Sequence, residues 1–308
     1  MLAEETIASS GHTRSRTYRL AERVVKKFYV REGLQEHVVW AQDIEPLLIG
    51  ARVAPNVVSI CEYAFTEMLN NAIDHSGSEQ VLVTVTLSVA VIEMAVIDFG
   101  IGIFRKIKEA RGLESDRQAI LEVTKCKITT DPTRHSGEGI FFTSRMMDSF
   151  GLISDELGLM HYRAHNDWLF ETKKLPVKGT IVVMKIDPVS EHTDKEVFER
   201  YQASQDDYAF AKTQIVLALA ETEGGNLVSR SQAKRVMVGL ERFREINLDF
   251  RGVPTIGPAF ADEIFRVWKR AHPESMITCS YASDEVTKMI SRSASQDQSP
   301  SEPPAPTE

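Results

Sequence analysis

Three polar side chains recur at a regular interval in one stretch of the chain. Glu67, Asn71 and His75 are each four residues apart, and residues at that spacing share one face of a helix. A carboxamide oxygen can hold Mg²⁺, and a carboxylate can position a water molecule or deprotonate a hydroxyl. Taken alone, Glu67 and Asn71 are a weak signal, because the polar face of an ordinary helix carries the same residue types.

A second group of candidate residues follows the apolar run Met94–Ile97. Asp98 ends this run, and Gly100 and Gly102 come directly after it. We expect a carboxylate at the end of a buried strand to need a hydrogen-bond donor. An adenine exocyclic amine is one candidate donor, and a structural serine or backbone amide is the alternative. The two glycines allow a sharp turn and the close approach of a flat ligand.

A third group is rich in small residues. Ser136, Gly137 and Gly139 stand directly before a helical pattern that begins at Ile140. Small residues at a helix start let backbone amides point at phosphate oxygens, and the helix dipole favours the anion. A plain capping turn is the alternative interpretation.

The hydrophobic pattern predicts the elements that must position these residues. Apolar residues recur at three- and four-residue spacing in 56–75, which predicts a helix with Asn56 as its N-cap. The polar, mixed stretch 113–138 is expected to be irregular, and such long stretches are usually functional. A helical pattern returns at 139–150, and strands are expected at 80–87, 91–98, 158–163, 167–172 and 180–187.

The order of these motifs resembles the GHKL superfamily, which includes gyrase, histidine kinases and MutL. Its boxes match Glu67–His75, Asp98–Gly102 and Ser136–Ile140, and then Gly179 and Thr180 before a strand. The conjunction is far more specific than any single motif. The resemblance covers about residues 35–190 and is closest to the anti-sigma-factor serine kinases. It implies an α/β (α+β) Bergerat-type fold, a mixed sheet with helices on one face.

The resemblance also implies a site for ATP and Mg²⁺. Glu67 would activate the attacking group, Asn71 would bind Mg²⁺, Asp98 would read adenine, and residues 103–136 would form the ATP lid. Those kinases carry a basic residue just before the glycines, so Arg134 or His135 could touch the γ-phosphate; an exposed lid charge is the alternative. The other expected cofactor-binding residues are His75, Gly100, Gly102, Ser136, Gly137, Gly139 and Thr180.

A second domain is expected after a polar connector at 188–210. From residue 211 the pattern alternates between strand and helix, which indicates a small α/β domain. Residues 205–292 resemble STAS domains, and more closely a STAS-like group that bacteria fuse behind GHKL domains. Where STAS domains carry a phosphoacceptor hydroxyl, this chain has Pro258. We therefore expect a docking or regulatory module, followed by a disordered tail at 293–308 that is rich in Ser, Pro and Glu.

Charge and cysteine usage narrow the function classes. The formal net charge of −8 argues against a general nucleic-acid or membrane binder. Residues 1–30 are locally basic and resemble the wing of a winged-helix domain, so nucleic acid is an expected partner only if an upstream part exists. A solvated face at a domain edge is the alternative. Apolar runs are too short to span a bilayer, and three scattered cysteines suit the reducing cytoplasm.

Three functions remain open. The first is an ATP-dependent regulatory switch, with slow ATPase activity coupled to the STAS-like module. The second is a serine/threonine protein kinase of the anti-sigma type that acts on a partner protein. The third is a DNA-linked transcription regulator. The missing acceptor at Pro258 favours the first over the second, and a regulatory protein partner is expected for either.

Overall fold

The computed structural model divides the chain into two compact units, Met1–Arg200 and Tyr201–Glu308. The described residues are 7–10, 17–125, 137–163, 168–171, 178–204, 207–220 and 226–295.

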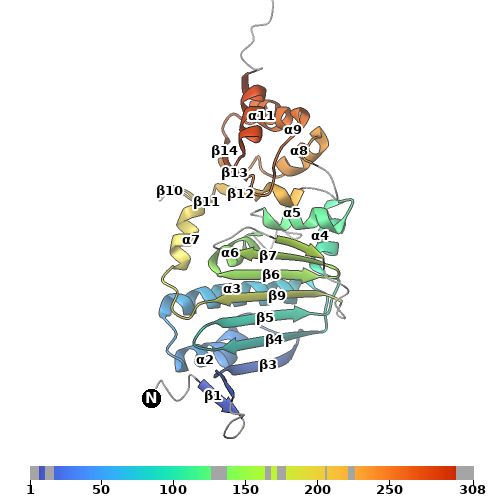
Figure 1. The fold of residues 1–308 in the computed structure, drawn as a ribbon. Helices are drawn as coiled ribbons and strands as arrows, with labels where there is room; N and C mark the ends of the chain where they lie inside the picture. The colour runs from blue at the N-terminus through green and yellow to red at the C-terminus, as the bar shows by residue number, and fades with distance from the viewer. Residues whose placement is uncertain are drawn as a thin grey trace, which may run out of the picture. The chain divides into compact units, whose positions relative to one another are not determined.

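The first unit is built on a sheet with the strand order β3-β4-β5-β9-β6-β7-β8 (Figure 1). Every neighbouring pair in it is antiparallel, so the α+β class is confirmed, but the sheet is not mixed as the resemblance implied. The reason is β9, which lies between β5 and β6 and separates two strands that run in the same direction. The strands are β3 (Arg23–Val30), β4 (Gln80–Leu87), β5 (Ile92–Asp98), β6 (Ser149–Ser154), β7 (Leu157–Tyr162), β8 (Trp168–Glu171) and β9 (Thr180–Ile186).

The basic N-terminal segment is not separate from this sheet. β3 pairs with β4 along its whole length, so the sheet begins before residue 35, the start expected from the resemblance. In this register Val85 lies opposite Val25, and Val83 lies opposite Lys27. Ahead of β3, the strands β1 (Ile7–Ser10) and β2 (Thr17–Leu20) form an antiparallel pair of their own.

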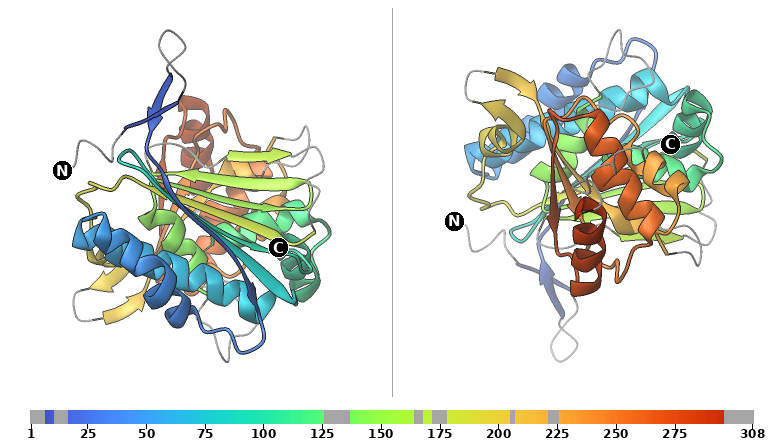
Figure 2. Two further views of the ribbon diagram at one scale, coloured as in Figure 1. Left: turned by 90° about the horizontal axis from the view of Figure 1, so that it is seen from below. Right: turned by 90° about the horizontal axis from the view of Figure 1, so that it is seen from above.

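Helices cover one face of the sheet, as the resemblance implied. In Figure 1 the sheet is seen from its open face with α3 behind it, and Figure 2 shows the blue helices between residues 36 and 75 along the same side. α3 contacts β5, β9 and α6, and α6 also contacts β6. The helices and helical turns are α1 (Glu36–Val39), the π-helical turn Trp40–Ile44, α2 (Glu45–Gly50), α3 (Pro55–His75), α4 (Ile103–Arg111), α5 (Asp116–Thr124), α6 (Gly139–Met146) and α7 (Asp194–Tyr201).

The long helix α3 follows directly from its sequence. The apolar residues that predicted it are all buried, Phe65 and Leu69 completely. Burying a side chain of this size stabilises the fold by about 1.5–3 kcal/mol relative to leaving it exposed. The helix therefore has a fixed rotation, which turns the face with Glu67 and Asn71 away from the apolar stripe.

The start of α3 differs from the prediction. Its N-cap is Ala54, and Pro55 occupies the first turn, so Asn56 already lies inside the helix. The Asn56 side chain instead donates hydrogen bonds to the backbone oxygens of Ser190 (2.7 Å) and His192 (2.8 Å). Asn56 thus fastens the helix to the segment that follows β9.

Two other sequence predictions in this unit are wrong. The stretch expected to be irregular holds α5, which Ser115 caps by accepting a hydrogen bond from the Gln118 amide. The helix expected over 139–150 ends at Met146, and β6 takes over from Ser149. Phe150 and Leu152 are buried, and β6 pairs with β7 and β9. Tertiary packing therefore decides between helix and strand here, which the local pattern did not.

The second unit has a three-stranded parallel sheet in the order β12-β13-β14. The predicted alternation of strand and helix is confirmed. α8 begins with a capping box formed by Ser229 and Gln232. The first strand of this sheet ends at Val216, and residues 217–220 form a 3-10 turn. The elements are β10 (Gln202–Ser204), β11 (Asp207–Phe210), β12 (Lys212–Val216), α8 (Arg230–Met237), β13 (Glu245–Asp249), α9 (Pro258–Asp262), the π-helical turn Glu263–Trp268, α10 (Lys269–Ala271), β14 (Met276–Ser280) and α11 (Asp284–Ser295).

The ends of this unit also differ from the expected range. β10 pairs with β11 inside the stretch expected to be a connector. At the other end α11 runs to Ser295, and Ser293 is buried, so the first residues of the expected tail 293–308 belong to a helix. Residues 296–308 lie outside the described residues.

The contacts of Asn56 generate a test that separates its two interpretations. Aspartate equals asparagine as an N-cap, but it cannot donate to two backbone oxygens. We expect Asn56→Asp to lower the free energy of unfolding by about 1–3 kcal/mol, and Asn56→Ala to be no worse. Urea unfolding followed by circular dichroism measures both. An Asp variant as stable as the wild type, with a weaker Ala variant, would restore the N-cap interpretation.

Candidate functional site

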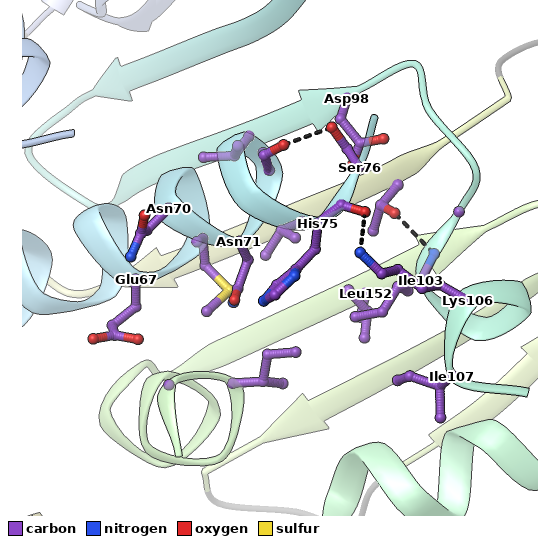
Figure 3. Close-up of a pocket in the computed structure, with 18 of the residues that line it drawn as sticks. Glu67, Asn70, Asn71, His75, Ser76, Asp98, Ile103, Lys106, Ile107 and Leu152 are labelled. Carbon is purple, nitrogen blue, oxygen red and sulfur yellow. Dashed lines mark hydrogen bonds between the residues drawn. The ribbon is translucent and has the colours of Figure 1, made fainter. Parts of the chain in front are cut away.

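The polar face of α3 lines a cavity of about 300 Å³ in the first unit (Figure 3). Glu67, Asn71 and His75 lie along it in the order of the helix turns and are partly exposed. The predicted spacing therefore brings all three to one cavity. Five further residues named from the sequence also line it: Asp98, Gly102, Gly137, Gly139 and Thr180.

Asp98 closes one end of the cavity at the last position of β5. Its side chain is buried, and Oδ1 accepts a hydrogen bond from the Gly100 amide at 2.9 Å. Burial raises the pKa of Asp98 above its ordinary value, although the hydrogen bonds from Gly100 and Thr180 and the charge of Lys106 oppose that rise. A carboxylate held in this way can accept a hydrogen bond from a ligand that enters the cavity.

The turn after Asp98 lies directly against the end of α3. The position of a Cβ at Gly100 is filled by the backbone carbonyl of Ser76, and the Ile101 amide donates to that same oxygen at 3.0 Å. Gly102 has φ +87°, a conformation that favours glycine, and it is the N-cap of α4. Both positions therefore require glycine for reasons of backbone conformation or packing. Gly102 lines the cavity, and Gly100 is not among its described lining residues.

The opposite wall of the cavity comes from the start of α6. Gly137, Gly139 and Ile140 line it, and a Cβ at Gly139 would overlap the Glu67 carboxylate. The positive end of the helix dipole and its first amides face this region, an arrangement suited to an anion. Arg134, His135 and Ser136, which were also predicted to bind the cofactor, lie outside the described residues.

Sequence reasoning missed Lys106. It lies on α4, lines the cavity, and donates from Nζ to the backbone oxygen of His75 at 2.7 Å (Figure 3). The signal was present, because Ile103, Lys106 and Ile107 have helical spacing directly after Gly102. The resemblance assigns residues 103–136 to the lid as a whole and gives Lys106 no role of its own.

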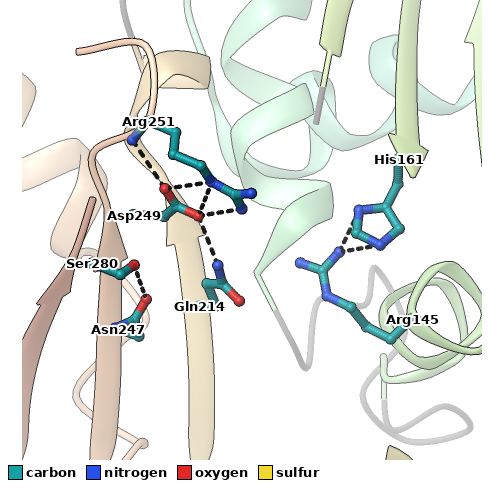
Figure 4. Close-up of polar contacts among 7 residues, drawn as sticks. All are labelled: Arg145, His161, Gln214, Asn247, Asp249, Arg251 and Ser280. Carbon is teal, nitrogen blue, oxygen red and sulfur yellow. Dashed lines mark hydrogen bonds and ion pairs between the residues drawn. The ribbon is translucent and has the colours of Figure 1, made fainter. Parts of the chain in front are cut away.

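A pair of side chains in the first unit gives His161 a structural role. Nη1 of Arg145, on α6, lies 2.8 Å from Nδ1 of His161, on β7 (Figure 4). The Arg145 guanidinium also lies over the ring of Phe141. These contacts hold the helix that carries Gly139 against the sheet.

The second unit has a separate polar cluster at the ends of its parallel strands. Asp249 is fully buried, and its carboxylate accepts hydrogen bonds from Arg251 and Gln214 (Figure 4). Asn247 accepts from Ser280 on the next strand. Pro258 is the first residue of α9. The position expected for a phosphoacceptor therefore begins a helix and has no hydroxyl.

Comparison with known families agrees with this geometry. Residues 14–160 match the family model of the histidine kinase-like ATPase domain, and residues 232–287 match that of a STAS-like domain of unknown function. The chain matches no curated protein. The chain therefore joins a histidine kinase-like ATPase domain of the GHKL superfamily to a C-terminal STAS-like domain.

This pairing supports a regulatory ATPase or kinase of the GHKL type in general, and such ATPases bind ATP. Such domains usually act with protein partners. Among the described residues, no helix has the length and apolarity that crossing a membrane would require.

The burial of Asp98 predicts how stability changes with pH. Because its pKa is raised on folding, the folded chain keeps this proton to higher pH than the unfolded chain does. Its contribution to stability is complete below the ordinary pKa of 3.8 and is lost as the pH rises through the raised value.

Asp98→Asn removes this titration, so we expect the variant to gain stability relative to the wild type as the pH rises. Urea unfolding without nucleotide, from about pH 4 to about pH 7, measures the difference at each pH. If the stability of Asp98→Asn relative to the wild type stayed constant or fell as the pH rises, the pKa of Asp98 would not be raised on folding.

Proposed function

We propose that the protein is an ATP-dependent regulatory switch, in which bound Mg·ATP and its slow hydrolysis change how the STAS-like module engages a partner protein. The observation that carries the proposal is the single cavity that Glu67, Asn71, Asp98 and Gly139 share. They come from three segments of the chain, namely α3, the end of β5 and the start of α6. Each has the chemistry that one part of an ATP molecule needs.

The described residues fit an adenine nucleotide. The cavity volume of about 300 Å³ lies at the lower end of the range for ligand pockets. At one end the buried Asp98 carboxylate would accept a hydrogen bond from the adenine amine. At the other end the first amides of α6 would face phosphate oxygens.

The residues of α3 fit a magnesium ion beside the phosphates. Mg²⁺ prefers oxygen ligands, and Asn71, which lines the cavity one helix turn from Glu67, has an amide oxygen that could hold the ion. The ion would offset negative charge on the phosphates. Glu67 would hold or deprotonate the attacking group, because its carboxylate lies beside Gly139 at the start of α6.

The STAS-like domain supports a switch rather than a kinase that phosphorylates its own second domain. Pro258 has no hydroxyl and begins α9, so the usual acceptor is missing. Transfer of the phosphate to a separate partner protein is the alternative that the same cavity allows.

The role proposed for Asp98 can be measured by nucleotide binding. Asp98→Asn removes a charge-assisted hydrogen bond to the adenine amine, which is worth about 1.5–3 kcal/mol, or roughly ten- to hundredfold in affinity. Calorimetric titration with Mg·ATP measures the loss. Asp284→Asn, at an exposed aspartate of the second unit, controls for the lost charge. Equal ATP affinity in wild type and Asp98→Asn, with the fold intact, rules out the adenine role.

Glu67 should affect turnover and leave binding in place. We expect Glu67→Gln to keep its affinity for Mg·ATP and to lose roughly 10²–10⁴ in the rate of phosphate release or transfer, as for a general base. Glu62→Gln, on the exposed side of the same helix, should leave the rate unchanged. ATP labelled at the γ-phosphate, with cell extract added, shows whether the label reaches water or a protein. Wild-type turnover in Glu67→Gln would mean that Glu67 has no role in the chemical step and is only a polar residue on the helix surface.

The same variant tests the switch itself. Glu67→Gln should hold Mg·ATP without consuming it, and hydrogen exchange of the β12–β14 amides should then change between the ATP-bound and nucleotide-free forms. Coupling between sites is typically 1–3 kcal/mol, roughly five- to 150-fold in an equilibrium constant. Identical hydrogen exchange in the two forms would mean that nucleotide binding is not coupled to the STAS-like domain.

A further inference from the structure

The two edge strands of the parallel sheet in the second unit differ in burial. On β12, Thr213, Ile215 and Val216 are buried. β14 has no buried residue, and its Met276 side chain is about half exposed. Within the part of the chain that the structure describes, β14 pairs with β13 and with no other strand. Its outer edge is therefore accessible to a strand from another molecule.

The backbone of β14 presents hydrogen-bonding groups along this outer edge. The Met276 amide donates to the Arg244 oxygen at 2.6 Å, and the Phe250 amide donates to the Ser280 oxygen at 2.9 Å. The backbone groups of residues 276, 278 and 280 thus point toward β13, because the side to which a residue points them alternates along a strand. The amides and carbonyls of Ile277 and Cys279 therefore point outward, which gives the edge two donors and two acceptors.

The side chains of β14 do not oppose a second strand. The segment Met276–Ser280 has no charged residue and no proline, which are features that natural edge strands often use against pairing. Asn247 of β13 also fixes this strand, because it donates to Oγ1 of Thr278 at 3.0 Å and accepts from Oγ of Ser280 at 2.8 Å (Figure 4). An incoming strand would thus meet an edge that is already ordered, so little conformational freedom is lost on pairing.

The sequence of β14 complements itself when two copies run antiparallel about a two-fold axis at Thr278. In this register all five residues pair, and Ile277 of each copy lies opposite Cys279 of the other. Both of these residues point their backbone groups outward, so each such pair can exchange two hydrogen bonds. Thr278 lies opposite its own counterpart, and threonine pairs across strands are favourable. No like charges meet in this arrangement.

We propose that the outer edge of β14 is a homodimer interface, to which a second copy of this chain adds its own β14. The two three-stranded sheets would then join into one continuous sheet. A two-fold contact of this kind uses the same surface on both copies and closes, so it yields a dimer and not a filament. The inference goes beyond the proposed function, because it requires no nucleotide.

The first test removes the outward amide of Cys279. Proline is tolerated on an edge strand where its nitrogen faces away from the sheet, so Cys279→Pro should keep the pairing with β13. Sedimentation velocity of the full chain at several concentrations measures the Kd of the dimer. We expect Cys279→Pro to raise this Kd by roughly ten- to hundredfold. Cys279→Ala is the matched control, because it changes the side chain but keeps the amide, and it should dimerise like the wild type.

The second test reads the register and does not depend on the proline variant. In a chain with Cys126→Ser and Cys279→Ala, Thr278→Cys would place two Cα atoms about 4.5 Å apart across the axis, within the range of a disulfide. Met276→Cys in the same chain would lie about 13 Å from its counterpart. Mild oxidation and non-reducing electrophoresis should therefore give cross-linked dimers for Thr278→Cys alone.

Three outcomes would overturn the inference. A wild-type chain that stays monomeric would leave this edge to a strand of another protein. A dimer whose Kd is unchanged in a folded Cys279→Pro variant would have its interface elsewhere. Equal cross-linking of Thr278→Cys and Met276→Cys, or none of either, would contradict the register about Thr278.

Discussion

The contact between the end of α3 and the turn after Asp98 is the constraint on which the first unit depends. Ser76 presents its backbone oxygen where a side chain at Gly100 would stand, and the Ile101 amide binds that oxygen. The helix with Glu67 and the strand that ends at Asp98 therefore meet at one point. Any side chain at Gly100 would push this helix and this strand apart. The two ends of the cavity would then also move apart.

Much of this arrangement could be predicted from the sequence. The i, i+4 spacing of Glu67, Asn71 and His75 gave their shared face, because the apolar stripe of α3 is unbroken and fixes the rotation of the helix. The strands β4 and β5 could be predicted because their residues alternate. The motif order gave the Asp98 turn, although the roles of these residues in binding and catalysis remain predictions.

The rest depended on contacts that no local pattern contains. Asn56 has the residue type of an N-cap, but its partners lie more than 130 positions away, at Ser190 and His192. β6 could not be separated from α6, since a short apolar run fits either structure. Lys106 looked like any lysine on a charged helix until its distance to the His75 oxygen was known.

β3 is an edge strand of the sheet, and this position affects what its basic residues do. Arg23, Lys26 and Lys27 lie on this edge strand and are exposed. An edge strand presents unpaired backbone groups to other chains, and natural proteins often oppose such pairing with charge, lysine above all. Two copies of β3 that approached each other would bring like charges together. The basic residues of β3 therefore oppose edge-to-edge pairing between two copies of this strand.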